Sequence, residues 1–250
     1  MPTLRAAVCA CTIAGLAGCA AIPHFSSPDT AKPADALQLR AFNETWVEQR
    51  LPTKTPTEYR RVQRDGREAI VAQADGSASL MRRQLRIEPA QLGRLRLSWL
   101  VEDLIADADM GSRERDDSPV RVVLAFDGDR SRFSARDAAA SELSMLMTGE
   151  PLPYATLMYV WCNQRAPGSV IDNPRTTRIR KIVLESGTAG LGRWHDYERD
   201  VRADYEKAFG EPPGALIGVG LMTDADNTRA RARAWYGAPQ LLTRRDTDPR

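Results

Sequence analysis

Apolar and polar side chains alternate along much of this chain, and a period of two is typical of half-buried β-strands. In residues 94–100, for example, two leucines and a tryptophan alternate with Arg94, Arg96 and Ser98. Continuous apolar runs with the length of central strands occur as well. Together the two patterns predict about eight strands, at residues 69–74, 79–87, 94–100, 120–126, 155–162, 178–186, 216–222 and 235–242.

Two segments instead space their apolar residues as α-helices do. One is residues 135–147, in which Leu143, Leu146 and Met147 share a face, and the other is residues 197–209, which a glycine follows where a C-terminal cap belongs. The strands do not alternate regularly with helices, as they would in a parallel sheet. The order of elements therefore predicts an all-β protein, an antiparallel β-sandwich with two short helices.

The amino end has the features of a secretory signal peptide over residues 1–18, because one cation, Arg5, precedes a short apolar core. Residues 16–19, Leu-Ala-Gly-Cys, resemble the lipobox of bacterial lipoproteins. The resemblance implies cleavage before Cys19, lipidation of that residue, and a membrane anchor in the cell envelope. Ala20, rather than aspartate, points to the outer membrane of a Gram-negative bacterium. The alternatives are a secretory signal cut elsewhere and an uncleaved anchor.

The remaining chain divides into three parts. Residues 19–36 combine the lipidated cysteine with a stretch rich in alanine, proline and serine, which predicts a flexible tether. Residues 37–243 contain every predicted strand and helix and are expected to form one β-sandwich domain. Residues 244–250 are expected to be a disordered tail. Cys162 keeps no partner for a disulfide in the mature chain, and its apolar neighbours predict that it is buried.

Charge and motif content exclude several classes of function. Lys and Arg number 35 against 33 Asp and Glu, and this net charge of +2 gives no electrostatic footprint for nucleic acid. Two histidines are too few for a His-rich metal site. The patterns Gly-x-Ser-x-Gly and His-Glu-x-x-His and the phosphate-binding loop do not occur in the sequence. No catalytic residue is therefore predicted.

Several segments match one family in order along the chain. They are SASL at 77–80, RDDSPVR at 115–121, LPYATLMYVW at 152–161, Trp194, residues 199–210, TDADNT at 223–228 and WYG at 235–237. The ordered set resembles the bacterial family known as domain of unknown function 3047, over residues 45–242. Its pattern is also similar to galactose-binding-like jelly rolls, which include carbohydrate-binding modules. The resemblance implies a jelly-roll-like sandwich and assigns no activity.

Acidic and guanidinium groups recur in three of these segments. Arg121 interrupts an apolar strand and needs a partner, which Asp116 or Asp117 could provide. Further charged residues come from the second helix and from the loop after the strand at 216–222, namely Arg199, Asp200, Asp204, Asp224, Asp226 and Asn227. Two interpretations stand: a buried ionic network that joins these segments, or a ligand-binding cleft built from the same groups.

Asp224, Asp226 and Asn227 also offer oxygen ligands of the kind that calcium prefers, although the spacing of an EF-hand is absent. A turn stabilised by Asp and Asn side chains explains them equally. No other cofactor is predicted. Trp194 lies in a glycine-rich segment that predicts an exposed loop, where an indole could contact a sugar ring.

Three hypotheses of function follow. The first is an envelope lipoprotein, not an enzyme, whose sandwich binds a glycan or a partner protein. The second is a hydrolase or lyase that acts on polysaccharide through the acidic residues. The third is a structural or assembly lipoprotein without a small ligand. The membrane is an expected partner through Cys19, and nucleic acid is not.

Overall fold

The structure is a computed structural model that describes residues 36–37 and 46–242. The helices are α1 (Ala135–Thr148) and α2 (Val201–Phe209), with one 3-10 turn, η1 (Arg130–Arg132). The strands are β1 (Ala36–Leu37), β2 (Val47–Arg50), β3 (Glu58–Arg64), β4 (Arg67–Asp75), β5 (Ser79–Ile87), β6 (Arg94–Val101), β7 (Ser118–Phe126), β8 (Ala155–Cys162), β9 (Val170–Asp172), β10 (Ile179–Ser186), β11 (Trp194–Asp200), β12 (Leu216–Asp224) and β13 (Arg231–Leu242). The predicted signal peptide, Cys19 and the tail lie outside the described residues, as does the predicted tether apart from its last residue.

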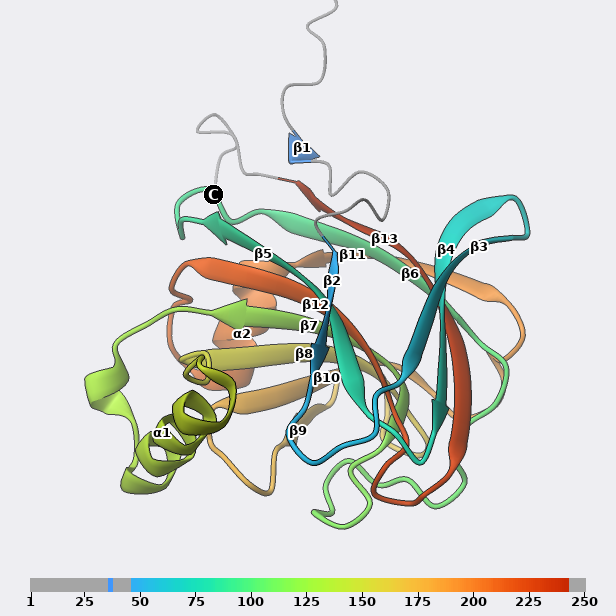
Figure 1. The fold of residues 1–250 in the computed structure, drawn as a ribbon. Coiled ribbons are helices and arrows are strands. Elements are labelled where there is room, and N and C mark those ends of the chain that lie inside the picture. Colours follow the sequence, from blue (N-terminus) through green and yellow to red (C-terminus); the bar gives the residue numbers. More distant parts are fainter. Residues whose placement is uncertain (1–35, 38–45, 243–250) are drawn as a thin grey trace, which may run out of the picture. The chain divides into compact units, whose positions relative to one another are not determined.

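The strands form two sheets, and neighbouring strands within a sheet are often far apart in the chain. One sheet runs β11-β6-β13-β4-β3, with β1 beside β13, and the other runs β2-β5-β12-β7-β8-β10-β9. Successive strands from β4 to β7 alternate between the sheets, and β4-β13-β6-β11 packs on β5-β12-β7-β8 (Figure 1). This interleaved order is that of a jelly roll. The predicted jelly-roll-like sandwich with two short helices is confirmed.

One strand pair departs from the antiparallel pattern. Strand β10 runs parallel to β8, with Ile182 beside Tyr159. The chain reverses twice between them, because it first runs back as β9, which pairs antiparallel with β10. The remaining pairs of the seven-stranded sheet are antiparallel.

The interior between the sheets takes every second residue of each central strand. In β7 the inward residues, all fully or almost fully buried in the main core, are Val120, Val122, Leu124 and Phe126. Because successive side chains of a strand point to opposite faces, the outer face of this sheet receives Arg121, Val123 and Ala125. A buried cluster of charged residues and an open hollow both lie on this outer face rather than in the core.

The second helix begins later than its sequence predicts. Residues 194–200 form β11, which pairs antiparallel with β6, and Tyr197 packs its ring on Trp99. Asp200 is extended and caps α2 by accepting a hydrogen bond from the backbone N–H of Ala203 at 3.0 Å. The prediction of a helix from Tyr197 is therefore wrong, because alternating burial and pairing with β6 outweigh the helical spacing.

The described residues all belong to one compact unit, residues 35–250. Cys162 is a free, buried thiol, as its apolar neighbours predict. Among the described residues, neither helix is long and apolar enough to cross a membrane.

Candidate functional site

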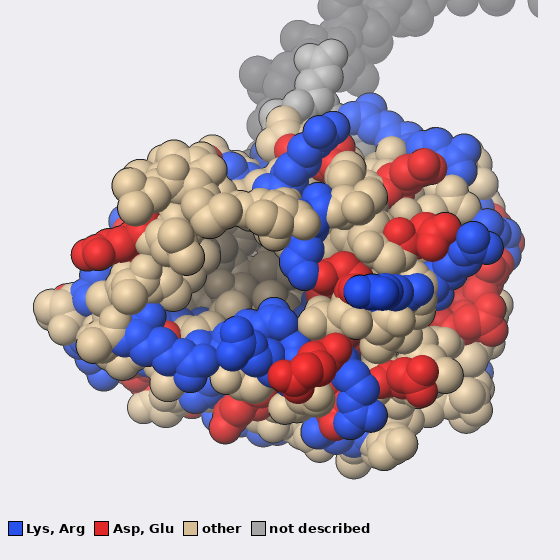
Figure 2. All heavy atoms as spheres, turned by 60° about the horizontal axis from the view of Figure 1, so that its bottom comes forward, with Lys and Arg blue, Asp and Glu red and all other residues tan. Residues whose placement is uncertain are grey.

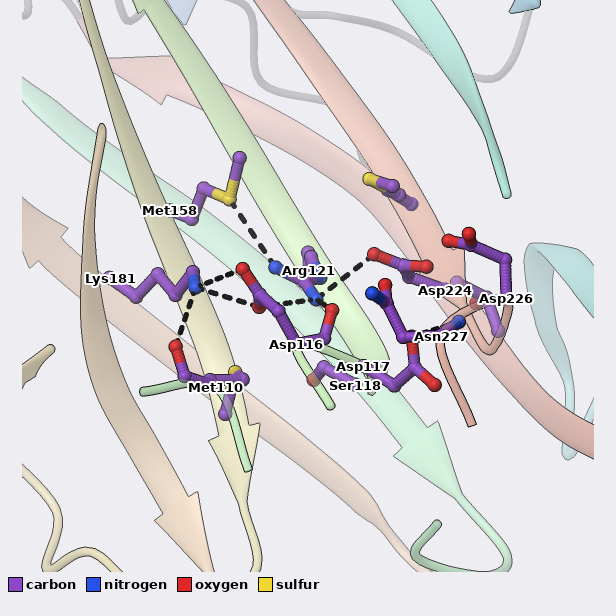
Figure 3. Close-up of polar contacts among 12 residues, drawn as sticks. Met110, Asp116, Asp117, Ser118, Arg121, Met158, Lys181, Asp224, Asp226 and Asn227 are labelled. Atoms are coloured by element: carbon purple, nitrogen blue, oxygen red, sulfur yellow. Dashed lines mark hydrogen bonds and ion pairs between the residues drawn. The ribbon is translucent and has the colours of Figure 1, made fainter. Parts of the chain in front are cut away.

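A network of buried charges occupies one end of the outer face of the seven-stranded sheet (Figure 3). Arg121, only 3% exposed, contacts carboxylate oxygens of Asp116 at 3.1 Å and Asp224 at 3.0 Å. On the other side of Asp116, the Lys181 ammonium donates to both of its oxygens at 2.7 Å and to the carbonyl oxygen of Met110 at 2.9 Å. The chain around Met110 thus covers the network.

Burial and pairing shift the pKa values in this network. Burial raises the pKa of Asp116, but the neighbouring Arg121 and Lys181 outweigh it and hold that pKa below its ordinary value. Burial and the Arg121 charge lower the pKa of Lys181 to about 8, although Asp116 opposes them. Burial raises the pKa of Asp224 well above its ordinary value, and Arg121 compensates only in part. Asp224 is thus the least satisfied acid of the network.

Asp117 points away from Asp116 and fixes a different segment. Its carboxylate accepts hydrogen bonds from the backbone N–H groups of Asn227, at 3.1 Å, and Thr228, at 2.7 Å, and from the Thr228 hydroxyl at 2.6 Å. The loop that follows β12 is therefore attached to the start of β7. One carboxylate oxygen each of Asp117, Asp224 and Asp226 lies within 4.8 Å of the others.

The residues that the sequence assigns to the second helix do not join this network; Arg199 and Asp200 lie in β11 and Asp204 in α2. Arg199 and Asp204 form their own ion pair at 2.5 Å, and the Tyr159 hydroxyl donates to Asp204 at 2.8 Å. Tyr159 lies in the core between the sheets, whereas its neighbour Met158 points to the outer face with Arg121. No contact among the described residues links Arg199, Asp200 or Asp204 to Arg121. The interpretation that all three segments meet is therefore corrected.

Trp194 is the first residue of β11 rather than part of an exposed loop, so that prediction is wrong. Its indole is half-buried beside Val71 and Trp235 and lies 5.1 Å from the Arg67 guanidinium carbon. An indole engaged on one face in this way offers less of its surface to a sugar ring than an exposed loop tryptophan would.

A hollow of about 680 Å³ opens on the same outer face, beside the charged network. Figure 2 shows it as a depression between apolar walls, with Lys and Arg side chains along its rim. Its floor consists of small and apolar residues of β5, β12, β7 and β8, including Leu80, Val123, Ala125, Met158, Gly218 and Gly220. Among the described lining residues, none is tryptophan, tyrosine or phenylalanine.

Gly218 and Gly220 of β12 deepen the floor of the hollow because they carry no side chain. A Cβ atom on Gly218 would contact only the Arg83 carbonyl oxygen at 3.6 Å and the Ala125 Cβ at 3.7 Å, and on Gly220 it would meet Leu80 at 3.1 Å. Neither glycine has a positive φ. Gly218 therefore admits a side chain without a clash, and that side chain would stand in the hollow, whereas at Gly220 Leu80 would have to shift.

Helix α1 forms a wall of the hollow and presents apolar residues that no other described element covers. Leu143 and Met147, which line the hollow, are 56% and 51% exposed, and Leu146 next to them is 84% exposed. The only residues that the helix buries are Asp137 and Ser141. An apolar face of this extent without a partner marks an interaction site.

Polar contacts rather than apolar packing attach α1 to the sheet. The Asp137 carboxylate accepts hydrogen bonds from the hydroxyls of Thr177 and Ser134 at 2.7 Å, and from that of Thr176. Burial raises the pKa of Asp137, but these hydrogen bonds outweigh it and lower the pKa to about 2. This one carboxylate therefore joins the helix to the segment before β10.

Three guanidinium groups border the hollow. Arg82 makes a two-pronged ion pair with Glu150 at 2.7 Å, and Arg130 donates to Ser141 at 3.0 Å and to the Leu152 carbonyl oxygen. The Arg50 side chain is 77% exposed. Since Glu150 is the only acid among the described lining residues, the charge of the rim is positive.

Two features of this face escape sequence reasoning. The sequence pattern makes Lys181 one polar residue of an alternating strand. It shares a face with Ile179 and Val183, however, and this position indicates a buried cation. The hollow has a weaker signal in the helical stripe of Leu143, Leu146 and Met147, which sequence alone suggests is packed.

Comparison with known proteins adds a family and distant fold neighbours. A family described as protein of unknown function (DUF3047) matches residues 44–240. No curated protein matches the chain. Among solved structures, the chain is similar to the family 11 carbohydrate-binding module of the cellulosomal cellulase Lic26A-Cel5E of Clostridium thermocellum, with 8% identity over 83% of this chain and 93% of that chain and a TM-score of 0.41. It is also similar to the xyloglucanase domain of NopAA, a type three effector from Sinorhizobium fredii, with 9% identity over 81% and 92% of the two chains and a TM-score of 0.39.

Proposed function

The chain belongs to the family of unknown function DUF3047, and from its own geometry we propose that it binds an anionic single-chain amphiphile in the hollow. The observation that carries this proposal is the pairing of an apolar floor with an unpartnered apolar helix face. A volume of about 680 Å³ falls within the roughly 300–1,000 Å³ of small-molecule sites. An acyl chain in the hollow would cover Leu143 and Met147.

The rim selects the head group. Arg50, Arg82 and Arg130 outnumber Glu150, so a carboxylate or phosphate monoester is complementary in charge. Arg82 and Arg130 have close protein partners, whereas Arg50 is 77% exposed and lies 3.9 Å from Glu48, so Arg50 is the most accessible cation. A long-chain fatty acid or an alkyl phosphate has the required chemistry.

Binding is favoured over catalysis at the acidic residues. Asp116, Asp117 and Asp224 are buried, and each is engaged by cations or backbone N–H groups. A polysaccharide chain is too large to reach carboxylates that are buried to this degree. These residues therefore support the fold of the sheet end rather than a hydrolase or lyase mechanism.

Glycan binding is the alternative that the sequence raises. Sugar rings bind to proteins largely through aromatic platforms and hydrogen bonds. The described lining of the hollow offers Gln49, Gln84 and the three arginines for hydrogen bonds but no aromatic ring. The amphiphile is thus preferred here, and oligosaccharides serve as the competing ligand in the test.

Titration of the purified protein with a dansyl-labelled undecanoic acid tests the proposal. We expect saturable fluorescence, displacement by palmitate and dodecyl phosphate, and little displacement by dodecyl maltoside, which is neutral. Each added methylene should tighten binding by about 0.8 kcal/mol, or roughly fourfold, until the hollow is full. If cello-oligosaccharides displace the probe, or if they bind and the probe does not, the amphiphile proposal is wrong and the ligand is a glycan.

Gly218→Leu should abolish binding without loss of stability, because the new side chain occupies the hollow and meets no backbone at clashing distance. Ala139→Leu adds bulk to the exposed side of α1, outside the lining, and is the matched control. Unchanged affinity in Gly218→Leu would overturn the assignment of the site.

We also propose that lipid on Cys19 anchors the domain to the envelope membrane, as the lipobox resemblance implies. Such an anchor would place the hollow where amphiphiles are abundant. Metabolic labelling with radioactive palmitate should modify the wild type but not Cys19→Ser, which should fractionate with soluble periplasmic proteins. A Cys19→Ser variant that remains in the outer-membrane fraction would contradict the anchor.

A further inference from the structure

The structure points to a calcium site between Asp117, Asp224 and Asp226, at the junction of β7 with the loop after β12, and this inference is independent of the amphiphile proposal. These three acids come from two segments more than 100 residues apart in sequence, and one oxygen of each lies within 4.8 Å of the others. Hard oxygen ligands from carboxylates are those that Ca²⁺ prefers.

The decisive observation is an unsatisfied oxygen of Asp224. Asp224 is only 6% exposed, and its Oδ2 atom pairs with Arg121 at 3.0 Å. Its Oδ1 atom has no hydrogen-bond partner among the described residues. In Figure 3 this side chain directs one oxygen to Arg121 and the other toward Asp226. A buried acceptor without a donor, aimed at another carboxylate, needs a cation, a water or a shared proton between the two groups.

The other two acids retain free capacity for a metal. Asp117 accepts three hydrogen bonds from residues 227 and 228, and an ionised carboxylate has about four acceptor positions. Asp226 is half-buried and contacts Lys54 through its Oδ2 atom. Waters would complete the six to eight oxygens that Ca²⁺ takes.

The local charge balance leads to the same ligand. The connected acids are Asp116, Asp117, Asp224 and Asp226, and the cations that contact them are Arg121, Lys181 and Lys54. When all four carboxylates are ionised, the three cations leave one negative charge uncompensated. Since Lys54 is partly exposed and holds only Asp226, it is the cation that a metal ion would displace. Lys54 and Ca²⁺ therefore compete for this site.

Calorimetric titration of the full mature chain with CaCl₂ at constant ionic strength tests the inference. We expect one Ca²⁺ per chain, a rise in Tm with Ca²⁺ that is reversed by a chelator, and weaker binding of Mg²⁺, which tolerates irregular geometry poorly. Asp226→Asn should weaken Ca²⁺ binding by at least about tenfold. Asp65→Asn, which removes the same charge in the exposed turn between β3 and β4, should leave it unchanged.

Lys54→Met provides the sharper result, because the two interpretations predict different outcomes. If Lys54 competes with the metal, its removal tightens Ca²⁺ binding severalfold. If the three acids form only a structural ion-pair cluster, the variant loses stability and still binds no Ca²⁺. No heat of binding in the wild type, or Ca²⁺ affinity that is equal in the wild type, Asp226→Asn and Lys54→Met, would overturn the site. Neither result bears on the dansyl-probe titration of the hollow.

Discussion

Arg121 and Val123 lie two residues apart on β7 and point to the same outer face of the seven-stranded sheet, yet their surroundings are opposite. Both side chains are almost buried, at 3% and 6% exposure, but charged groups surround Arg121, whereas Val123 lies in the floor of the apolar hollow. Met158 touches both regions, since its sulfur lies 3.9 Å from Arg121 and its side chain lines the hollow. The surroundings of a residue on this face therefore depend on the segment that packs over it.

The covering segments explain the difference. The chain before β7 packs Met110 against Val160 and Val183, and closes over the charged network. Helix α1 stands beside the other end of the sheet and is joined to it through Asp137, so the apolar floor stays accessible (Figure 1). Exposing an apolar surface of this kind to water costs free energy. This cost supports the proposal that a ligand covers the hollow.

The largest effect is expected at the charged end. Asp116→Ala leaves Lys181 and, in part, Arg121 without their anion, and should lower the free energy of unfolding by about 3–5 kcal/mol. Denaturant unfolding followed by circular dichroism measures this loss. Asp65→Asn in the exposed β3–β4 turn, where asparagine tolerates the left-handed backbone, should change stability by less than about 0.5 kcal/mol. A loss below about 1 kcal/mol at Asp116 would mean that water reaches the network.

A smaller and local effect is expected where α1 is attached. Asp137→Ala removes the acceptor for Thr176 and Thr177, and should cost about 1–3 kcal/mol. Hydrogen exchange should accelerate in α1 and remain unchanged in the core strands, and affinity for the dansyl probe should fall. Equal acceleration in every element would show that the carboxylate supports the whole fold instead.

The same carboxylate predicts a pH dependence. Its pKa is about 2 in the folded protein, below the ordinary value of 3.8, so the stabilisation is present above about pH 4 and is lost as the pH falls toward 2. The loss should be on the order of 1–2 kcal/mol. Hydrogen exchange of α1 between pH 4 and 2 measures it, and Asp137→Asn should show a flatter profile. Identical profiles would contradict the role of Asp137.

The smallest effect distinguishes two neighbours on α1. Leu146→Ser should change stability by less than about 0.5 kcal/mol and leave probe affinity unaltered, because Leu146 is exposed and lies outside the lining. Leu143→Ser should weaken probe binding several-fold with a similarly small effect on stability. If both variants weaken binding equally, the ligand covers the whole helix face and not the hollow alone.

The sequence allows most of the fold to be predicted, because alternation identifies many of the strands and the order of elements indicates an antiparallel sandwich, while the jelly-roll arrangement follows from the family resemblance. It predicts that Arg121 requires an acidic partner, since a charge in an apolar strand is costly to bury. It cannot predict the β8–β10 parallel pair, because the reversal through β9 is a matter of chain path. It misplaces Trp194 and Tyr197, whose pairing with β6 is a long-range contact.

The candidate site is predicted less well for a related reason. Residues such as Gly218, Ala125 and Met158 are ordinary in a β-sheet, and only their convergence under a helix that does not pack on them forms a hollow. Lys181 resembles a surface lysine until the chain around Met110 covers it.

Photo-crosslinking with a diazirine derivative of palmitic acid, followed by peptide mapping, tests the central claim most directly. The claim predicts crosslinks within α1 and within β7 and β12, competition by unlabelled palmitate, and their loss in Gly218→Leu. Crosslinks confined to the six-stranded sheet, or unaffected by Gly218→Leu, would contradict it.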